Sequence, residues 1–191
     1  MTGRRILAVA VVVIVAIVVV AAVWIRVPRA TSRATPRAVG APAPTAPAPP
    51  GRKIKARLFY VADDGMRLAN VERDIAYGDG ATEQAREIIA AQIAPAVDPL
   101  VSAVPHGTAL RAVFITQRGE AYVDLSRDVV NAHPGGTLNE LLTVYTIVNA
   151  LTVNLPAVTS VQLLVDGKEI DTLSGHVDLR QPLAKNLTWV Q

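Results

Sequence analysis

Cysteine is absent from the 191-residue sequence. Without cysteine the chain cannot form disulfides, use a thiol nucleophile, hold an iron–sulfur cluster or bind zinc through thiolates. A lipid anchor on an acylated cysteine is excluded for the same reason. The redox compartment stays open, because an extracytoplasmic domain with a sufficient hydrophobic core needs no disulfide.

Acidic residues are absent from the first 62 positions. Residues 1–53 carry eight of the 19 Lys and Arg residues, whereas residues 54–191 hold the other 11 and all 16 acidic residues, a net charge of −5. The basic character of the whole chain is therefore a property of its N-terminal arm. An acidic domain lacks the basic face that displaces counterions from nucleic acid, so we expect no nucleic-acid partner.

Aromatic residues are also few, at 4% of the chain. We expect Tyr60, Phe114 and Tyr145 on the apolar faces of their elements, which leaves few rings for the surface. A glycan-binding or glycan-hydrolysing domain of the envelope is the alternative function that the sequence leaves open. Sugar-binding surfaces usually expose aromatic rings, and glycan hydrolysis needs two spaced carboxylates. The scarcity of rings counts against this alternative.

One long apolar run occupies residues 6–25, which contain no charged residue and no proline. A helix of that length spans about 30 Å, the thickness of the hydrocarbon core of a bilayer. A cleaved signal peptide is the alternative, but its apolar region is about 7–15 residues long and ends at small residues. The sequence therefore predicts an uncleaved transmembrane anchor.

The charges that flank this run do not agree on its orientation. Arg4 and Arg5 precede it, whereas four arginines follow it at positions 26, 29, 33 and 37, so the positive-inside rule gives at best a tie. A short tail before a single span is, however, the layout of a signal anchor. We therefore expect a single-pass protein of the cytoplasmic membrane with its C-terminal domain on the extracytoplasmic side.

Residues 26–53 form a Pro/Ala-rich linker with seven prolines and no acidic residue. Alternating proline favours the extended polyproline II helix, which rises about 3.1 Å per residue. The segment is predicted to be a spacer between the membrane and the domain that follows.

Residues 54–191 are predicted to form one α+β domain, in which two helices pack on one face of a mixed or antiparallel sheet. The expected order is β-β-α-β-β-α-β-β. Strands are expected at residues 53–62, 68–76, 109–116, 120–125, 160–165 and 168–172. Thr82 is a predicted helix N-cap, and Thr137-Leu-Asn-Glu140 is a predicted capping box. Asp166-Gly167 predicts a type I′ hairpin turn.

Six segments follow one another along this domain. They are LFYVADDGMRLANVERDI (58–75), VPHGTALRAVFI (104–115), GEAYVDLS (119–126), ELLTVYTIVNALT (140–152), VQLLVDG (161–167) and SGHVDL (174–179). Together they resemble the GerMN family, the sporulation and spore germination domain, over about residues 56–183. One difference is Ala94-Pro95 after the first helix, where family members often have Gly-Pro.

The resemblance implies a membrane-anchored or lipid-anchored extracytoplasmic module. It implies a fold similar to the ring-building motifs of envelope assemblies, and no established catalytic role. It also supports the extracytoplasmic orientation that the flanking charges leave open.

Three histidines are the first candidates for chemistry. His106, His176 and Asp178 could furnish a metal site, since imidazole and carboxylate suit zinc or iron. The sequence has no HExxH motif and no histidine pair at helical spacing, and His133 stands alone before the second helix. We therefore predict no metal site and no cofactor.

The residue types of a hydrolase triad also occur, as Asp124, Ser126, Ser174 and His176. No Gly-x-Ser-x-Gly motif surrounds either serine. We expect the Asp124 carboxylate to accept main-chain N–H groups at the end of its strand and Ser126 to begin the next turn. No catalytic residue is predicted.

The remaining polar clusters and glycines are predicted to lie in turns. Asp63-Asp64-Gly65 joins the first two strands, and glycines 78, 80, 135 and 136 precede the helices without a phosphate-binding motif. Three acids, Asp166, Glu169 and Asp171, lie along one hairpin, where a solvated face is expected in preference to a calcium contact.

These observations favour a non-enzymatic interaction or scaffold module of the cell envelope. Its expected partners are other envelope proteins or further copies of the same chain. Edge strands are natural places for a partner strand to add, and residues 68–76 and 160–165 are the candidates. Charged residues at 71–74 are typical of a protected edge, which favours the other edge or a helix face.

Overall fold

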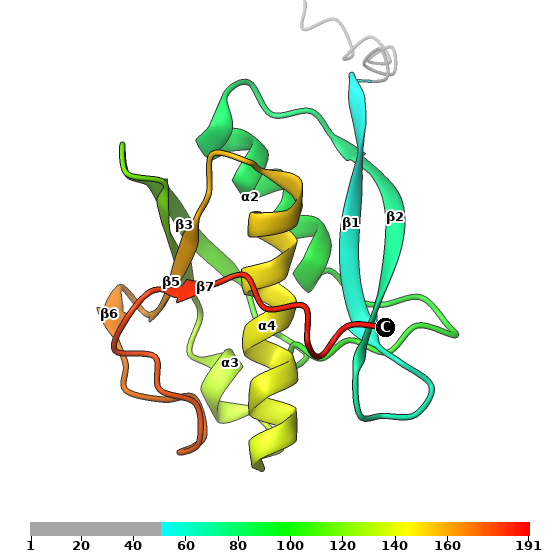
Figure 1. Cartoon of the computed structure of the whole chain (residues 1–191), viewed down its shortest axis with the longest axis vertical. Helices are drawn as coiled ribbons and strands as arrows, with labels where there is room; N and C mark the ends of the chain where they lie inside the picture. The colour runs from blue at the N-terminus through cyan, green and yellow to red at the C-terminus, as the bar shows by residue number, and fades with distance from the viewer. Residues whose placement is uncertain (1–50) are drawn as a thin grey trace, which may run out of the picture. The chain divides into compact units, whose positions relative to one another are not determined.

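The computed structural model describes residues 51–191, which form an α+β domain (Figure 1). The predicted anchor at 6–25 and the linker up to residue 50 lie outside the described residues. No helix of the described part is long and apolar enough to cross a membrane. The strands are β1 (Lys53–Val61), β2 (Leu68–Ala76), β3 (Leu110–Ile115), β4 (Glu120–Leu125), β5 (Ser160–Val165), β6 (Lys168–Glu169) and β7 (Leu183–Ala184), and the helices are α2 (Ala81–Ile93), α3 (Asp128–Asn131) and α4 (Thr137–Asn154).

The described strands form two sheets. β1 and β2 make an antiparallel ribbon in which Lys53 lies opposite Ala76 and Val61 opposite Leu68. The second sheet has the order β3-β4-β5-β6, and β7 also pairs with β5. β4 and β5 run parallel, with α4 in the connection between them, whereas the other pairs are antiparallel.

The helices α2 and α4 lie between the two sheets (Figure 1). α4 packs on β1 and on β5, while α2 packs on β1, β2 and β3 and on α4. The expectation of a single sheet with helices on one face is therefore wrong, because β1 and β2 form a layer of their own. Both sheets and both helices contribute to one core that includes Phe59, Leu68, Ile88, Leu125 and Ile147.

Amide side chains of the helices occupy the edge of β1 that faces away from β2. Gln92 on α2 accepts the Phe59 N–H at 2.8 Å and donates to the Phe59 carbonyl at 2.7 Å. Asn154 at the end of α4 makes the same two bonds with Arg57, at 2.8 and 2.7 Å. Each amide supplies the donor and the acceptor that a neighbouring strand would offer. The outward main-chain groups of Arg57 and Phe59 are thus satisfied without pairing to the second sheet.

Both long helices begin at a glycine instead of a predicted capping residue. Gly80 precedes α2 and Gly136 precedes α4, with φ of 87° and 85°, and neither helix has a side-chain cap. Glycine adopts such angles without the strain that a Cβ would cause. The predicted N-cap Thr82 lies inside α2, and Thr137 with Glu140 forms no capping box. These two predictions are wrong.

Several strand predictions are confirmed, and others are corrected. β2, β4 and β5 have the expected bounds, whereas β6 ends at Glu169 and the elements α3 and β7 were not expected. The predicted edge at residues 160–165 is wrong, because β5 is flanked by β4 on one side and by β6 and β7 on the other. Phe114 is 60% exposed on β3, contrary to expectation, because it alternates there with the buried Val113.

The predicted type I′ turn between β5 and β6 is confirmed. Asp166 has φ 51° and Gly167 has φ 74°, the positive values that this turn requires at both central positions. The Gly167 N–H donates to Asp124 Oδ1 at 2.7 Å, which ties the turn to the end of β4.

Replacing Gly167 with valine is expected to lower the free energy of unfolding by about 1–3 kcal/mol, because a β-branched residue is strained at positive φ. Crowding contributes little, since the nearest atom to a Cβ there is Asp124 Oδ2 at 4.0 Å. Urea melts of both proteins measure the change. Gly51→Val is the control, at a glycine without positive φ or a close neighbour. An unchanged melt for Gly167→Val would contradict the role given to the turn.

Candidate functional site

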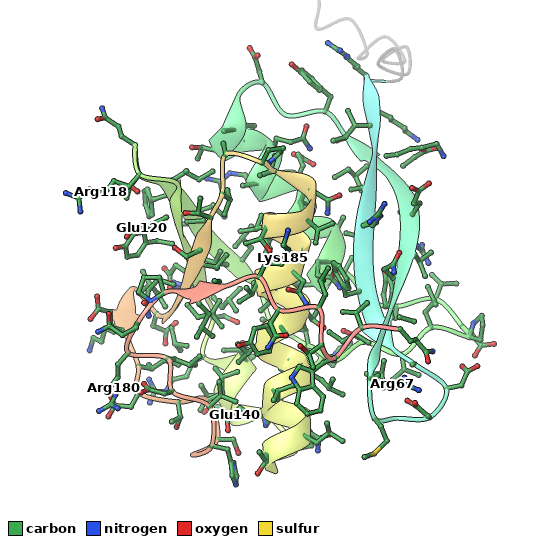
Figure 2. All side chains as sticks on the ribbon, in the orientation of Figure 1. Arg67, Arg118, Glu120, Glu140, Arg180 and Lys185 are labelled. Atoms are coloured by element: carbon green, nitrogen blue, oxygen red, sulfur yellow. The ribbon has the colours of Figure 1, made fainter. Side chains whose placement is uncertain are left out.

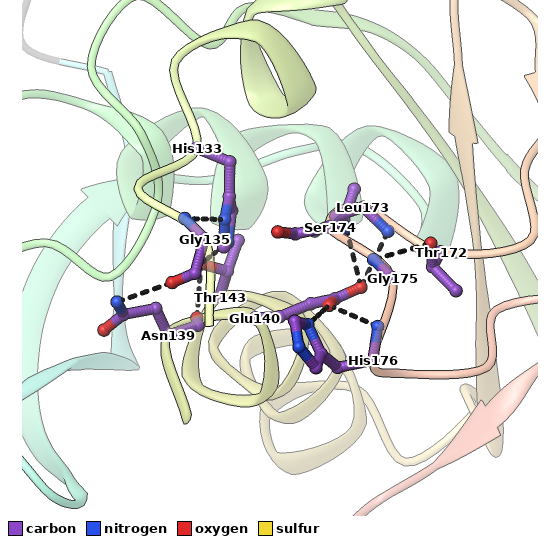
Figure 3. A network of polar contacts seen from close by, with 10 residues as sticks. All are labelled: His133, Gly135, Asn139, Glu140, Thr143, Thr172, Leu173, Ser174, Gly175 and His176. Atoms are coloured by element: carbon purple, nitrogen blue, oxygen red, sulfur yellow. Dashed lines mark hydrogen bonds and ion pairs between the residues drawn. The ribbon is translucent and has the colours of Figure 1, made fainter. Parts of the chain in front are cut away.

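A buried carboxylate at the start of α4 binds the segment of residues 172–178. Glu140 is completely buried, and its Oε1 accepts the N–H groups of Leu173 at 2.8 Å and Ser174 at 3.0 Å. Its Oε2 accepts the His176 N–H at 2.9 Å and lies 3.2 Å from His176 Nδ1 (Figure 3). Figure 2 shows Glu140 beside α4, whereas the labelled Arg118 and Arg180 lie near the outline of the domain.

These bonds fix the charge state of Glu140. Burial by itself raises the pKa of this carboxyl, but the N–H groups of Ser174, His176 and Leu173 stabilise the ionised form and bring the pKa below its ordinary value. The carboxylate is therefore charged at neutral pH. It supplies the hydrogen-bond acceptors that hold the main chain of the segment 172–178.

His133 belongs to a second group of contacts in the same region (Figure 3). Its Nδ1 accepts the Gly135 N–H at 3.0 Å, and its Nε2 lies 3.3 Å from Thr143 Oγ1. The Thr143 hydroxyl also lies 2.6 Å from the Ala103 carbonyl, which connects α4 to the loop before β3. Burial lowers the pKa of His133, against the opposing charge of Glu140, so the ring is neutral at pH 7.

Acidification is expected to destabilise the domain in two steps. Because the folded pKa of His133 lies below the ordinary 6.5, the unfolded chain binds this proton first, and the free energy of unfolding falls as the pH drops through about 6.5. Glu140 adds a further loss as the pH falls below the ordinary 4.5 toward its folded value. Above these ordinary pKa values, both groups make their full contribution to the free energy of unfolding. Urea melts between pH 7.5 and pH 3.5 measure the profile.

The variant His133→Asn separates the two steps, because its Oδ1 can accept the Gly135 N–H without titrating. The decline between pH 7 and pH 5 should flatten in this variant and persist in the matched control His106→Asn, which changes an exposed histidine. A wild-type profile that is level or rises on acidification contradicts this assignment.

The structure uses the predicted triad residues locally. Asp124 Oδ1 accepts the Gly167 N–H, as the sequence predicts for a carboxylate at a strand end. Its Oδ2 lies 3.1 Å from Arg111 Nε, a contact that was not predicted. Ser126 Oγ accepts the Ala109 N–H at 3.0 Å, and the Ser126 carbonyl accepts the Val129 N–H, which confirms the predicted turn.

The three candidate metal ligands, His106, His176 and Asp178, do not form one cluster. His176 lies on Glu140, and Asp178 pairs with Arg180 at 2.7 Å, which lowers the pKa of Asp178 to about 2. His106 lies in the loop before β3. Among residues 51–191, no three His, Asp or Glu side chains come close enough to hold a metal ion. The acids of the β5–β6 hairpin are exposed, and Asp166 lies 3.6 Å from Arg111 Nη1.

The turn predictions fit the structure. Asp64 Oδ1 accepts the Met66 N–H at 2.8 Å, and its Oδ2 pairs with Arg67, which together lower the pKa of Asp64. Gly78 leaves room for the start of α2, because a Cβ there would clash with the main-chain nitrogen of Gln84.

A groove of about 680 Å³ lies between the end of α2 and the loop that leads to β3. Its lining consists of Ile93, Ala94, Pro95, Ala96, Ser102, Ala103, Val104, Pro105, His106, Gly107, Thr108, Ala132 and Pro134. Ser102 and Thr108 bond to neighbouring main-chain carbonyls. His106 is the ionisable residue of this lining, so the groove offers an apolar contact surface.

A family model that matches the chain over most of these elements shows the family to which it belongs. The model of the Germane family, described as sporulation and spore germination, matches residues 57–171. This range runs from β1 to the segment after β6 and exceeds half of the chain. The chain belongs to the Germane, or GerMN, family. The resemblance found in the sequence is thereby confirmed.

Two solved structures share the GerMN fold of this chain. A lipoprotein candidate from Clostridium perfringens has 24% sequence identity and a TM-score of 0.50, over 70% of this chain and 88% of that chain. The tandem GerMN domains of the sporulation protein GerM from Bacillus subtilis have 16% identity and a TM-score of 0.51, over 70% of this chain and 46% of that chain. No curated protein matches the chain.

The residues that organise this GerMN domain were not predicted as such. The sequence predicts Glu140 only as part of a helix cap and does not single out Gln92. The sequence signal that could have identified them is a charged or amide residue at a core position of a helix, because a buried polar group needs a hydrogen-bond partner. The sequence does not say which segment supplies that partner.

Proposed function

We propose that this chain is a membrane-anchored GerMN-domain protein of the cell envelope that acts by binding other proteins and not by catalysis. The observation that carries the proposal is the internal use of its buried and half-buried ionisable side chains. Glu140, His133 and Asp124 each accept main-chain N–H groups of their own domain. Groups bonded in this way hold loops in place, and the groove, whose lining includes Ala132 and Pro134 on either side of His133, is largely apolar.

The location is supported by the sequence and by a structural neighbour. The uncharged residues 6–25 have the length of a membrane span. Residues 26–53 would hold the domain away from the membrane, by about 85 Å when fully extended. The Clostridium perfringens neighbour is a lipoprotein candidate, which fits an envelope position.

Topology is tested with reporters fused after Gln191. Alkaline phosphatase at this position is expected to be active and a fluorescent protein that folds only in the cytoplasm to be dark. Deleting residues 6–25 should reverse both signals. A bright cytoplasmic reporter on the full chain would overturn the extracytoplasmic placement.

Association is tested by chemical cross-linking in intact cells, followed by detergent solubilisation and purification of the full chain. Discrete cross-linked species that survive His106→Ala are expected, since this substitution alters the ionisable residue of the groove without touching the fold. A loss of cellular function in His106→Ala, with an unchanged melt and unchanged cross-links, would favour the enzymatic alternative.

A further inference from the structure

The edge of β2 that faces away from β1, here called the outer edge, is a regular strand edge. The Leu68 N–H donates to the Trp189 carbonyl at 2.7 Å, and the Leu68 carbonyl accepts the Gln191 N–H at 2.9 Å. The main chain of Leu68 therefore points away from β1. Because main-chain direction alternates along a strand, the same is true of Asn70, Glu72 and Asp74.

Both ends of the outer edge are closed, and its middle is open. Residues 189–191 close it at Leu68, and Gln84 Nε2 donates to the Ala76 carbonyl at 3.3 Å. Within the described part of the chain, the outward N–H and carbonyl groups of residues 70, 72 and 74 have no hydrogen-bond partner. β2 contains no proline, glycine or bulge that would prevent pairing there. The open stretch of five residues is about 17 Å long.

The fold treats its two ribbon edges differently. Gln92 and Asn154 occupy the edge of β1 at Phe59 and Arg57. The outer edge of β2 instead carries the exposed carboxylates of Glu72 and Asp74. Each of these acids has a basic residue opposite it on β1: Glu72 lies opposite Arg57, and Asp74 lies 4.0 Å from Lys55. All four side chains are exposed, so such pairing is weak and a new cation on the open side of β2 can share the carboxylates.

Pairing between two copies of this edge is disfavoured. The antiparallel register that uses all three open residues of both copies places Glu72 opposite the same residue of the second copy. Like charges directly opposite each other destabilise a strand pair. Charged side chains on an edge are a common device against such self-association. The occupant that fits the edge is therefore a strand of complementary charge.

We propose that the outer edge of β2, from Asn70 to Asp74, binds an extended segment of another envelope protein that carries Lys or Arg at alternate positions. This inference rests on the proposed function and names the surface through which the chain binds its partner. Main-chain hydrogen bonds provide the attachment, and basic side chains lie about 5 Å from Glu72 and Asp74 on the solvent face. The apolar residues at the intervening positions lie beside Val71 and Arg73 on the other face.

Amide hydrogen exchange on the full chain in detergent micelles tests the proposal. The probe is the capped peptide Lys-Val-Lys-Val-Lys-Val-Lys, and the control peptide has Glu in place of Lys. Saturating lysine peptide is expected to slow exchange at Asn70, Glu72 and Asp74 at least tenfold. Val71 and Arg73 already bond to β1 and serve as internal references. The glutamate peptide should give no protection.

Two variants identify the edge as the binding site. Glu72→Pro removes an outward N–H without breaking the ladder to β1, and should abolish protection at Asn70 and Asp74. If this variant does not fold, the double variant with Glu72→Lys and Asp74→Lys is used instead. It should be protected by the glutamate peptide and no longer by the lysine peptide.

Three results would overturn the inference: no protection at the edge, equal protection by both peptides, or protection that appears with protein concentration alone and so indicates a second copy. Cross-linked partners that persist in Glu72→Pro would leave the proposed function standing and remove only the assignment of this edge.

Discussion

Replacing Glu140 with alanine is expected to lower the free energy of unfolding by about 3–5 kcal/mol. The substitution leaves the buried N–H groups of Leu173, Ser174 and His176 without their acceptor, and it also opens a cavity in the position of a fully buried side chain. Urea melts at pH 7 measure the loss. Amide exchange should become faster in residues 172–178, because these lose the group that holds them.

Two further variants check this result. Glu140→Gln retains one carbonyl oxygen and turns its amide group toward the other donors, so a smaller loss of about 1–3 kcal/mol is expected. Glu169→Ala removes an exposed carboxylate from β6 and should change the free energy of unfolding by less than about 0.5 kcal/mol. If Glu140→Ala melts like Glu169→Ala, the carboxylate does not hold the segment.

Replacing Gln92 with leucine is expected to cost about 2–4 kcal/mol. The size of the side chain is nearly kept, but the buried N–H and carbonyl of Phe59 lose both hydrogen bonds. Among residues 51–191, no strand lies on this side of β1 to replace them. The free energy of unfolding from urea melts is the measurement.

The matched control is Gln181→Leu, which makes the same exchange at an exposed position. Gln92→Glu adds a test of the donor, because an ionised carboxylate cannot donate to the Phe59 carbonyl whereas a protonated one can. This variant should be less stable than wild type at pH 7 and recover part of the difference near pH 4. Equal melts for Gln92→Leu and Gln181→Leu would contradict the role of the amide.

The two sheets show where prediction from the sequence stops. Alternating residues predict β1 and β2 individually, and the Asp166-Gly167 pair predicts its turn, because these signals come from neighbours in the chain. The layer to which β1 and β2 belong depends on Gln92 and Asn154, which reach β1 from helices 33 and 97 residues away. A local pattern contains no information about such partners.

Glu140 shows the same limit at the candidate site. Its spacing from Thr137 is that of a capping box. The main-chain N–H at the start of the helix therefore competes with distant N–H groups for the Glu140 carboxylate. The structure resolves the competition in favour of the segment 172–178, because its N–H groups offer a buried carboxylate several donors at once. Gly136, free of a Cβ, starts the helix without a side-chain cap.

By itself, the sequence determined the GerMN family, the α+β class, the positions of most strands, the local uses of Asp124 and Ser126, and an acidic domain behind a basic arm. These properties follow from composition, period and short motifs, each contained within a few neighbouring residues. The tertiary structure alone decided that the helices lie between two sheets, that β5 is internal, and that the open edge is the middle of β2. Those features depend on which distant groups satisfy each strand edge, and hydrogen-bond partners far apart in the chain are fixed only when the whole domain packs.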